Sequence, residues 1–134
     1  GIYISRDAGD NWQRIGKPLE SDFGFVVSCA KALPGQAFFV PLNGESRITS
    51  GGGFQVQKWT DSTRKFTPLI GRTKFPGDFG NHREGLACDN LESPGIYAGT
   101  STGQVFYSVT GGKTWDQIPF SFPGIHSVSV ANPA

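Results

Sequence analysis

The chain has few of the residues that hold metal ions, with only two histidines and two cysteines among its 134 residues. His82 and His126 are far apart in the sequence, and neither has a close-spaced partner, so a zinc site is not indicated. Calcium binding by loop carboxylates remains an open alternative, although the sequence has no calcium-binding motif. Gly51–Gly53 is no phosphate loop, because neither Lys-Ser/Thr nor a helix pattern follows it. We therefore expect no metal and no cofactor.

Long apolar runs are also missing, and the formal net charge is only +1. The first absence excludes a membrane-spanning helix, and the second gives no argument for nucleic-acid binding. No secretory signal precedes the predicted fold, although a chain that opens at Gly1 is also what trimming or cutting would leave.

The two cysteines, Cys29 and Cys88, occupy matching places in successive segments and are predicted to be small buried hydrophobes. A disulfide needs Cα atoms within about 7 Å, closer than we expect for equivalent strands of neighbouring units. Reduced thiols are therefore predicted, which favours a cytoplasmic setting.

Glycine and proline are plentiful, at 19 and 9 residues, and aromatic residues make up 13% of the chain. This composition favours many short strands joined by tight turns. An octapeptide, Ser5–Trp12, recurs as Ser108–Trp115. Short polar side chains at a turn start accept backbone N–H groups, and glycine suits a positive φ, so both copies predict a tight turn before an outgoing strand. Trp12 and Trp115 are predicted to begin that strand and to pack against the neighbouring sheet.

The shared pattern, Ser-x-Asp-x-Gly-x-Asn/Thr-Trp with Thr110 in place of Asp7, resembles the Asp box, or BNR repeat, of sialidase-like β-propellers. In that family the box closes the hairpin between the third and fourth strands of a blade, so the resemblance implies a structural role. Residues 59–66 are predicted to be a decayed third copy. The expected box residues are Ser5, Asp7, Gly9, Trp12, Asp61, Phe66, Ser108, Thr110, Gly112 and Trp115.

The spacing of the three copies supports a repeat. Trp12 and Phe66 are 54 positions apart, and Phe66 and Trp115 are 49 apart. Four-stranded propeller blades repeat every roughly 40 to 50 residues. The sequence therefore predicts an all-β chain of about three antiparallel blades.

The predicted organisation is a single partial β-propeller domain over residues 1–134. Its parts are a half blade (1–15), two blades (25–70 and 84–120) and a terminal inner strand (125–130). A closed propeller needs about four to eight blades. Because exposed sheet edges invite pairing, we expect either a fragment of a longer propeller or a protomer of a homo-oligomer. Segments 22–27, 37–42 and 95–106 resemble the C-terminal half of bacterial BNR-repeat proteins described as glycosyl hydrolases.

Resemblance to sialidases implies that ligands bind on the face opposite the boxes, at loops 16–24, 43–53 and 71–83. Two of these loops end in Asp22-Phe23-Gly24 and Asp78-Phe79-Gly80. In one interpretation, the aspartate caps a turn, the phenylalanine packs between blades and the glycine allows a sharp bend of the chain. In the other, Asp22 and Asp78 form a carboxylate pair at the channel mouth. Loop 43–53, which ends in three consecutive glycines, is either a mobile lid, a partner contact or a surface loop.

The densest polar cluster is Asn81-His82-Arg83-Glu84, with Arg72 and Lys74 upstream. Arg72, His82 and Arg83 are the candidates for binding an anionic or sugar ligand, since the guanidinium fork is bidentate. The alternative is a solvated loop.

Catalysis would need two carboxyl groups about 5 to 9.5 Å apart, and the candidates are Asp22, Asp78 and Glu84. Sialidase activity is not supported, because Arg47-Ile48 lacks the flanking residues of the family's Phe/Tyr-Arg-Ile-Pro segment. The first functional hypothesis is therefore a non-catalytic module that binds a carbohydrate or protein. The alternatives are part of a glycoside hydrolase, or a unit that only assembles.

Overall fold

The computed structural model describes residues 1–49, 51–70 and 73–131, in which there are ten strands and no helix. Every pairing between the strands is antiparallel, so the expectation of an all-β, antiparallel chain is confirmed. The strands are β1 (Tyr3–Ile4), β2 (Gln13–Arg14), β3 (Val27–Ser28), β4 (Gln36–Phe39), β5 (Gln57–Thr60), β6 (Lys65–Pro68), β7 (Leu86–Cys88), β8 (Ile96–Gly99), β9 (Val105–Ser108) and β10 (Asp116–Gln117).

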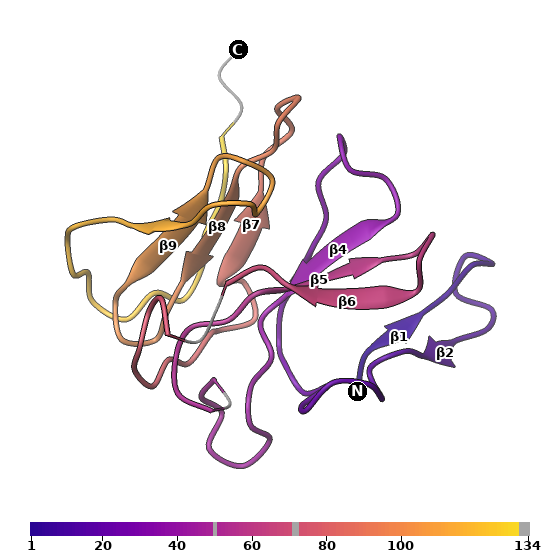
Figure 1. The fold of residues 1–134 in the computed structure, drawn as a ribbon, viewed down its shortest axis with the longest axis horizontal. Helices are drawn as coiled ribbons and strands as arrows, with labels where there is room; N and C mark the ends of the chain where they lie inside the picture. The colour runs from indigo at the N-terminus through magenta and orange to yellow at the C-terminus, as the bar shows by residue number, and fades with distance from the viewer. Residues whose placement is uncertain (50, 71–72, 132–134) are drawn as a thin grey trace.

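The strands form three sheets in which each strand pairs with its neighbour in the chain. A hairpin holds β1 and β2, one four-stranded sheet holds β3 to β6, and another holds β7 to β10. The sheets stand side by side in chain order, fanned about a common centre (Figure 1). The innermost strands of the two larger sheets, β3 and β7, contact each other. Short connections explain this order, since consecutive antiparallel strands need only a tight turn between them.

The alternating segment at 126–130 does not form the expected strand of a further sheet. Ser127 instead makes a single parallel bridge with Glu84, and the Val128 amide donates to the Glu84 carbonyl at 2.7 Å. The Ile125 amide donates to the carbonyl of Thr100 at 2.9 Å. The segment therefore lies along the start of β7, held by backbone hydrogen bonds.

One hydrophobic core joins the two four-stranded sheets. Phe54, which precedes β5, and Phe106, in β9, stack with ring centroids 4.4 Å apart. In β8, fully buried Ile96 and Ala98 alternate with half-buried Tyr97, as expected when one face of a sheet is covered. Apolar side chains at every second strand position thus supply the contact between the sheets.

Two predictions about burial are wrong. Trp12 was expected to pack against a neighbouring sheet as Trp115 does, but Trp12 is 63% exposed whereas Trp115 is 1% exposed. Cys29 was expected to be buried, but the residue is exposed, and both cysteines are free. The sequence does not distinguish a buried tryptophan or cysteine from an exposed one here, because burial depends on which other part of the chain packs against the residue.

The two octapeptides fold into turns with the same hydrogen bonds. The serine Oγ accepts the amide of the glycine four residues on, at 2.8 Å for Ser5 and Gly9 and at 2.9 Å for Ser108 and Gly112. The side chain two positions after the serine accepts another backbone amide. Asp7 accepts that of Asn11 at 2.9 Å, and Thr110 accepts that of Thr114 at 2.8 Å. Each tryptophan Nε1 donates to its turn's glycine carbonyl. Both glycines have positive φ, at 102° and 88°. A hydroxyl thus replaces the carboxylate without changing the turn.

The middle copy, 59–66, closes differently although its length is the same. Trp59 pairs with Phe66, and Thr60 with Lys65, so the strands extend where the other copies bend. The remaining four-residue turn has Arg64 at φ 53°. Because this copy lacks the serine and the glycine, nothing holds the wider turn open. Phe66 nevertheless occupies the place that Trp12 and Trp115 have in the other two copies. In each copy, the residue three positions after the aromatic one donates its amide to a carbonyl on the incoming side of the hairpin: Ile15 to Ile2, Leu69 to Val56 and Ile118 to Val105.

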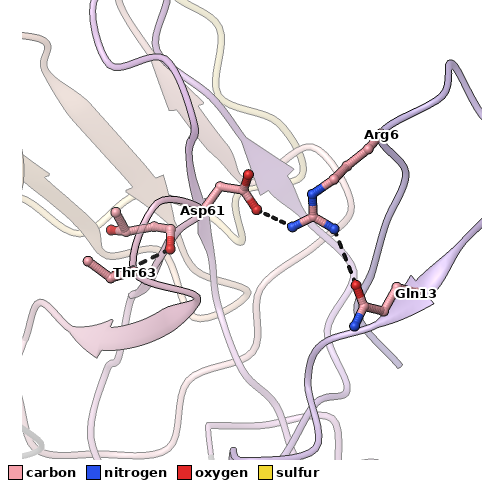
Figure 2. A network of polar contacts seen from close by, with 5 residues as sticks. Arg6, Gln13, Asp61 and Thr63 are labelled. Atoms are coloured by element: carbon pink, nitrogen blue, oxygen red, sulfur yellow. Dashed lines mark hydrogen bonds and ion pairs between the residues drawn. The ribbon is translucent and has the colours of Figure 1, made fainter.

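A polar network connects the first hairpin to the second sheet. Figure 2 shows the Arg6 guanidinium between Gln13, on the adjacent strand, and Asp61, at the β5–β6 turn. Arg6 and Asp61 form an ion pair with side chains 42% and 37% exposed. Because both groups are solvated, the pair orients the hairpin more than it stabilises the fold.

Candidate functional site

The loops at the end of the sheets away from the octapeptide turns line an open pocket of about 320 Å³. We call it the arginine pocket. Four separate parts of the chain contribute to it, so it exists only in the folded protein. Its lining residues are Phe25, Ser46, Arg47, Ile48, Gly80, Asn81, His82, Arg83 and Ser101.

Two guanidinium groups share one aromatic ring in this pocket. The Cζ atoms of Arg47 and Arg83 lie 5.9 and 5.1 Å from the ring centroid of Phe25. Cation–π contact holds each group without using its N–H donors. Those donors stay available for an anion, and the two positive charges act together on it.

Arg47 adopts a backbone conformation that residues with a side chain rarely take, with φ at 58°. Hydrogen bonds impose it: the Arg47 amide donates to the Asn43 carbonyl at 2.9 Å, and the Asn43 amide donates to the Ile48 carbonyl at 2.7 Å. Asn43 Oδ1 also accepts the amides of Glu45 and Ser46. Strain of this kind is concentrated at ligand sites, and here it fixes one wall of the pocket.

Asn81 forms part of the floor and is 3% exposed. Its Nδ2 donates to the carbonyls of Gly85 and Gly99 at 3.0 and 2.9 Å. Its Oδ1 is buried and has no hydrogen-bond partner among the described residues. This oxygen is closed to solvent, so Asn81 shapes the pocket by joining the Gly85 and Gly99 backbones and not by offering a free acceptor.

His82 connects the pocket to the terminal segment. Its ring stacks on that of His126, with centroids 4.7 Å apart and planes 22° apart. Because His82 also lines the arginine pocket, docking of segment 125–130 helps fix its orientation. The His82 imidazole thus lies beside the two arginines as a further hydrogen-bonding group.

A second cavity, of about 470 Å³, lies next to the first. We call it the carboxylate pocket, because Glu20 and Asp78 both line it. Ser46 and Ile48 line both cavities, so the loop between Asn43 and Thr49 is their common wall. The remaining lining residues are Ser21, Asn43, Gly44, Thr49, Gly51 and Gly52.

The structure brings together some of the predicted site residues and separates others. His82 and Arg83 share the arginine pocket, while Asp78 lines the carboxylate pocket. Asp22 forms an ion pair with Arg14 at 2.8 Å instead. The Arg14 hydrogen bond lowers the pKa of Asp22, so this carboxylate stays ionised. Glu84 is exposed beside the terminal segment, and Arg72 lies outside the described residues.

The two Asp-Phe-Gly motifs have mainly packing roles. Phe79 is 7% exposed and contacts Phe106 edge to face, with ring centroids 5.4 Å apart. A Cβ on Gly80 would lie 2.5 Å from Ser101 Oγ, and one on Gly24 would lie 2.6 Å from the Val40 carbonyl oxygen. The approaching Val40 backbone therefore requires glycine at Gly24, whereas at Gly80 an added methyl group would only displace the Ser101 hydroxyl.

Sequence reasoning missed Arg47, Phe25 and Glu20 as site residues. Loop 43–53 was a candidate by length, but nothing in its sequence indicates that Arg47 faces Arg83 across a phenylalanine. The repeat offered one signal, because loops that follow equivalent strands meet at the same end of neighbouring sheets.

Within the part of the chain that the structure describes, no helix has the length and apolarity needed to cross a membrane. Those same residues contain no group of three or more His, Cys, Asp or Glu side chains able to hold a metal ion. No protein-family model matches this chain, and no curated protein matches it either. The candidate site therefore has to be judged on its own chemistry.

Proposed function

We propose that this chain is a non-catalytic β-propeller module, or part of one, that binds an anionic carbohydrate in the arginine pocket. The observation that carries the proposal is the pairing of Arg47 and Arg83 over Phe25, beside His82 and Asn81. Arginine recognises a carboxylate through two parallel hydrogen bonds, and the neighbouring hydroxyl and amide groups suit sugar hydroxyls.

The interpretation of the sheets as propeller blades is part of this proposal. It is supported by the sequential strand order, the fanned arrangement in Figure 1 and the repeated hydrogen bonds of the two octapeptide turns. In this interpretation the turns are Asp boxes with a structural role only. The pocket then lies on the face that carries the loops between blades.

The test is to titrate the protein with glucuronate and to measure binding by calorimetry or NMR. Arg83→Gln and Arg47→Gln should each weaken binding about tenfold or more, because each removes a charge-assisted contact. Lys31→Gln removes an exposed positive charge at the β3–β4 turn, outside the pocket lining, and should leave binding unchanged. Equal losses in all three variants, or no binding by the wild type, would contradict the proposal.

The alternative, part of a glycoside hydrolase, is less well supported. It requires one protonated and one ionised carboxyl group facing each other across the bond. Asp22 is held ionised by Arg14, and Asp78 lines a cavity in which Asp22 takes no part. Release of reducing sugar from glucuronide-containing oligosaccharides, abolished by Asp78→Asn, would favour the hydrolase instead.

A further inference from the structure

We infer that His126 is a positioning residue for the arginine pocket, and that anion binding there is coupled to docking of the terminal segment (residues 125–130) that carries it. This inference rests on the proposed function and adds a part of the chain that lies outside the pocket lining. It is carried by the stacked histidine rings and by the contacts of the terminal segment behind the pocket.

The stacked rings are the direct connection. His126 lies on the half-buried ring of His82, with centroids 4.7 Å apart and planes 22° apart. The torsion that turns a histidine ring has broad minima, so an unsupported ring takes many orientations. A neighbour stacked on one face restricts the directions in which the His82 nitrogens point into the pocket. His126 thus acts on a ligand through His82.

The terminal segment also holds the backbone next to Arg83. The Val128 amide donates to the Glu84 carbonyl at 2.7 Å, and Ser127 makes a parallel bridge with the same residue. Glu84 directly follows Arg83, whose guanidinium lies 5.1 Å from the ring centroid of Phe25. Docking of the segment therefore fixes the point from which this guanidinium reaches the pocket.

The chain that leads into the segment supports a second wall of the pocket. The Ile125 amide donates to the Thr100 carbonyl at 2.9 Å, and a Cβ on Gly124 would lie 2.7 Å from the Ser101 carbonyl oxygen. The Ser101 amide in turn donates to the Gly80 carbonyl at 2.9 Å. Ser101 and Gly80 both line the pocket, so this wall is held from behind.

The floor of the pocket rests on the same segment. A Cβ on Gly99 would lie 2.4 Å from Ile125 Cγ2 and 3.1 Å from Val128 Cγ2, so both side chains pack directly on the Gly99 backbone. The Gly99 carbonyl accepts Nδ2 of Asn81, the floor residue, at 2.9 Å. Two walls and the floor thus share one support.

This support is lightly held, which makes the coupling measurable. His126, Ser127 and Ser129 are exposed, so the segment opens at a lower cost than the sheets. A segment that improves anion binding when it is docked must itself be held more tightly when the anion is bound.

The first test measures glucuronate affinity by calorimetry or NMR titration. His126→Ala should weaken binding about fivefold, the lower end of common coupling factors. His126→Phe keeps a ring on His82 and should restore most of that loss, which a hydrogen-bonding role of His126 would not allow. Ser129→Ala is the control, an exposed position in the same segment, and should bind as the wild type does.

The second test measures hydrogen exchange of the wild type with and without saturating glucuronate. Exchange of the Ile125 and Val128 amides should slow about fivefold, because the bound anion favours the docked segment. The Ile15 amide, which donates to Ile2 in the first hairpin, is the internal control and should be unaffected. Slowing of all three amides alike would show general stabilisation and contradict the coupling.

The outcomes separate this inference from the proposed function. If glucuronate binds through the arginines but His126→Ala binds it as tightly as the wild type, the positioning role is wrong and the arginine pocket stands. Equal losses in His126→Ala and His126→Phe would also overturn that role, and unchanged exchange on saturation would overturn the coupling. If the wild type does not bind glucuronate, the proposed function fails and this inference fails with it.

Discussion

Trp12 and Trp115 show how far one residue's role depends on its neighbours. Each follows an octapeptide turn of the same type, and each donates from Nε1 to the carbonyl of the glycine in its own turn. Only Trp115 is covered, being 1% exposed against 63% for Trp12. The turn's local chemistry is therefore independent of the packing energy that its tryptophan provides.

This contrast gives a stability prediction. Trp115→Ala should lower the free energy of unfolding by about 3 to 5 kcal/mol, because it leaves a large cavity in the core. Trp12→Ala, the matched control, should cost less than about 1 kcal/mol. Urea unfolding followed by fluorescence or circular dichroism measures both. Similar costs for the two variants would show that the tryptophans act through their turns rather than through burial.

The carboxylate of Asp7 makes the first turn sensitive to acid. Hydrogen bonds from the Asn11 side chain, the Asn11 amide and Ser5 lower its pKa from 3.8 to about 2. Since the folded state binds the proton less readily than the unfolded chain, this contribution to stability is present above pH about 4 and is lost as the pH falls towards 2.

Asp7→Thr, which copies the residue at Thr110, should remove this dependence. The difference in unfolding free energy between wild type and variant should shrink as the pH falls from about 4 to 2. Denaturant unfolding at several pH values gives this difference. A difference that stays constant over that range would contradict the role assigned to the carboxylate.

At the scale of elements, turn chemistry decides how each hairpin closes. The middle hairpin has the same length as the other two, yet its strands continue to Thr60 and Lys65. The Arg6–Asp61 pair in Figure 2 then joins one closing turn to the next. Turns of different geometry are thus accommodated without shifting the register of the sheets.

The terminal segment depends on one glycine. Gly103 has φ at 92°, and a Cβ there would lie 1.8 Å from the carbonyl oxygen of Phe122. Gly103→Ala should therefore displace the segment and remove the hydrogen-exchange protection of the Phe122 and Ile125 amides, which donate to Gly103 and Thr100. Gly111→Ala is the control, with φ at 62° and open space around the added methyl group. Retained protection in Gly103→Ala would contradict the packing described.

At the scale of the molecule, the strands of the first hairpin are largely exposed. A largely apolar pocket of about 300 Å³ lies between this hairpin and the β3–β6 sheet, lined in part by Ile2, Ile4 and Phe39. Tyr3 and Val27 beside it are 52% and 68% exposed. An open strand edge next to exposed apolar side chains favours association with another chain.

We therefore predict that the protein associates in solution, with a mass by light scattering greater than the 14.4 kDa of one chain. Val27→Lys should shift the mass towards that of one chain, because a charge would be placed in the contact. Lys31→Gln, at an exposed turn position, should not. A well-folded wild type that stays monomeric at high concentration would refute the prediction.

Much of the fold could be predicted from local signals. Strand existence follows from alternation, as in the stretch around Ile96 and Ala98, and the turns follow from Ser5, Gly9 and their later counterparts. Strand length was less predictable: residues 125–130 were expected as a strand, and Ser127 makes only a single bridge there. Strand ends depend on pairing with a neighbour, which no single segment specifies.

The candidate site was only partly predictable for a related reason. His82 and Arg83 stand together in the sequence, so their cluster is visible there. Their partners Phe25 and Arg47 come from other loops, and their contact depends on how the sheets are set side by side. Asp22 had the same local signal as Asp78, yet Arg14 withdraws it into an ion pair.

The sequence by itself determined the all-β class and the two octapeptide turns, because these depend on backbone conformation and alternation over a few residues. The tertiary structure alone decided which tryptophan is buried, which carboxylate is paired and which two arginines share a ring. Those outcomes depend on contacts between residues far apart in the chain, whose energies exist only once the sheets are packed together.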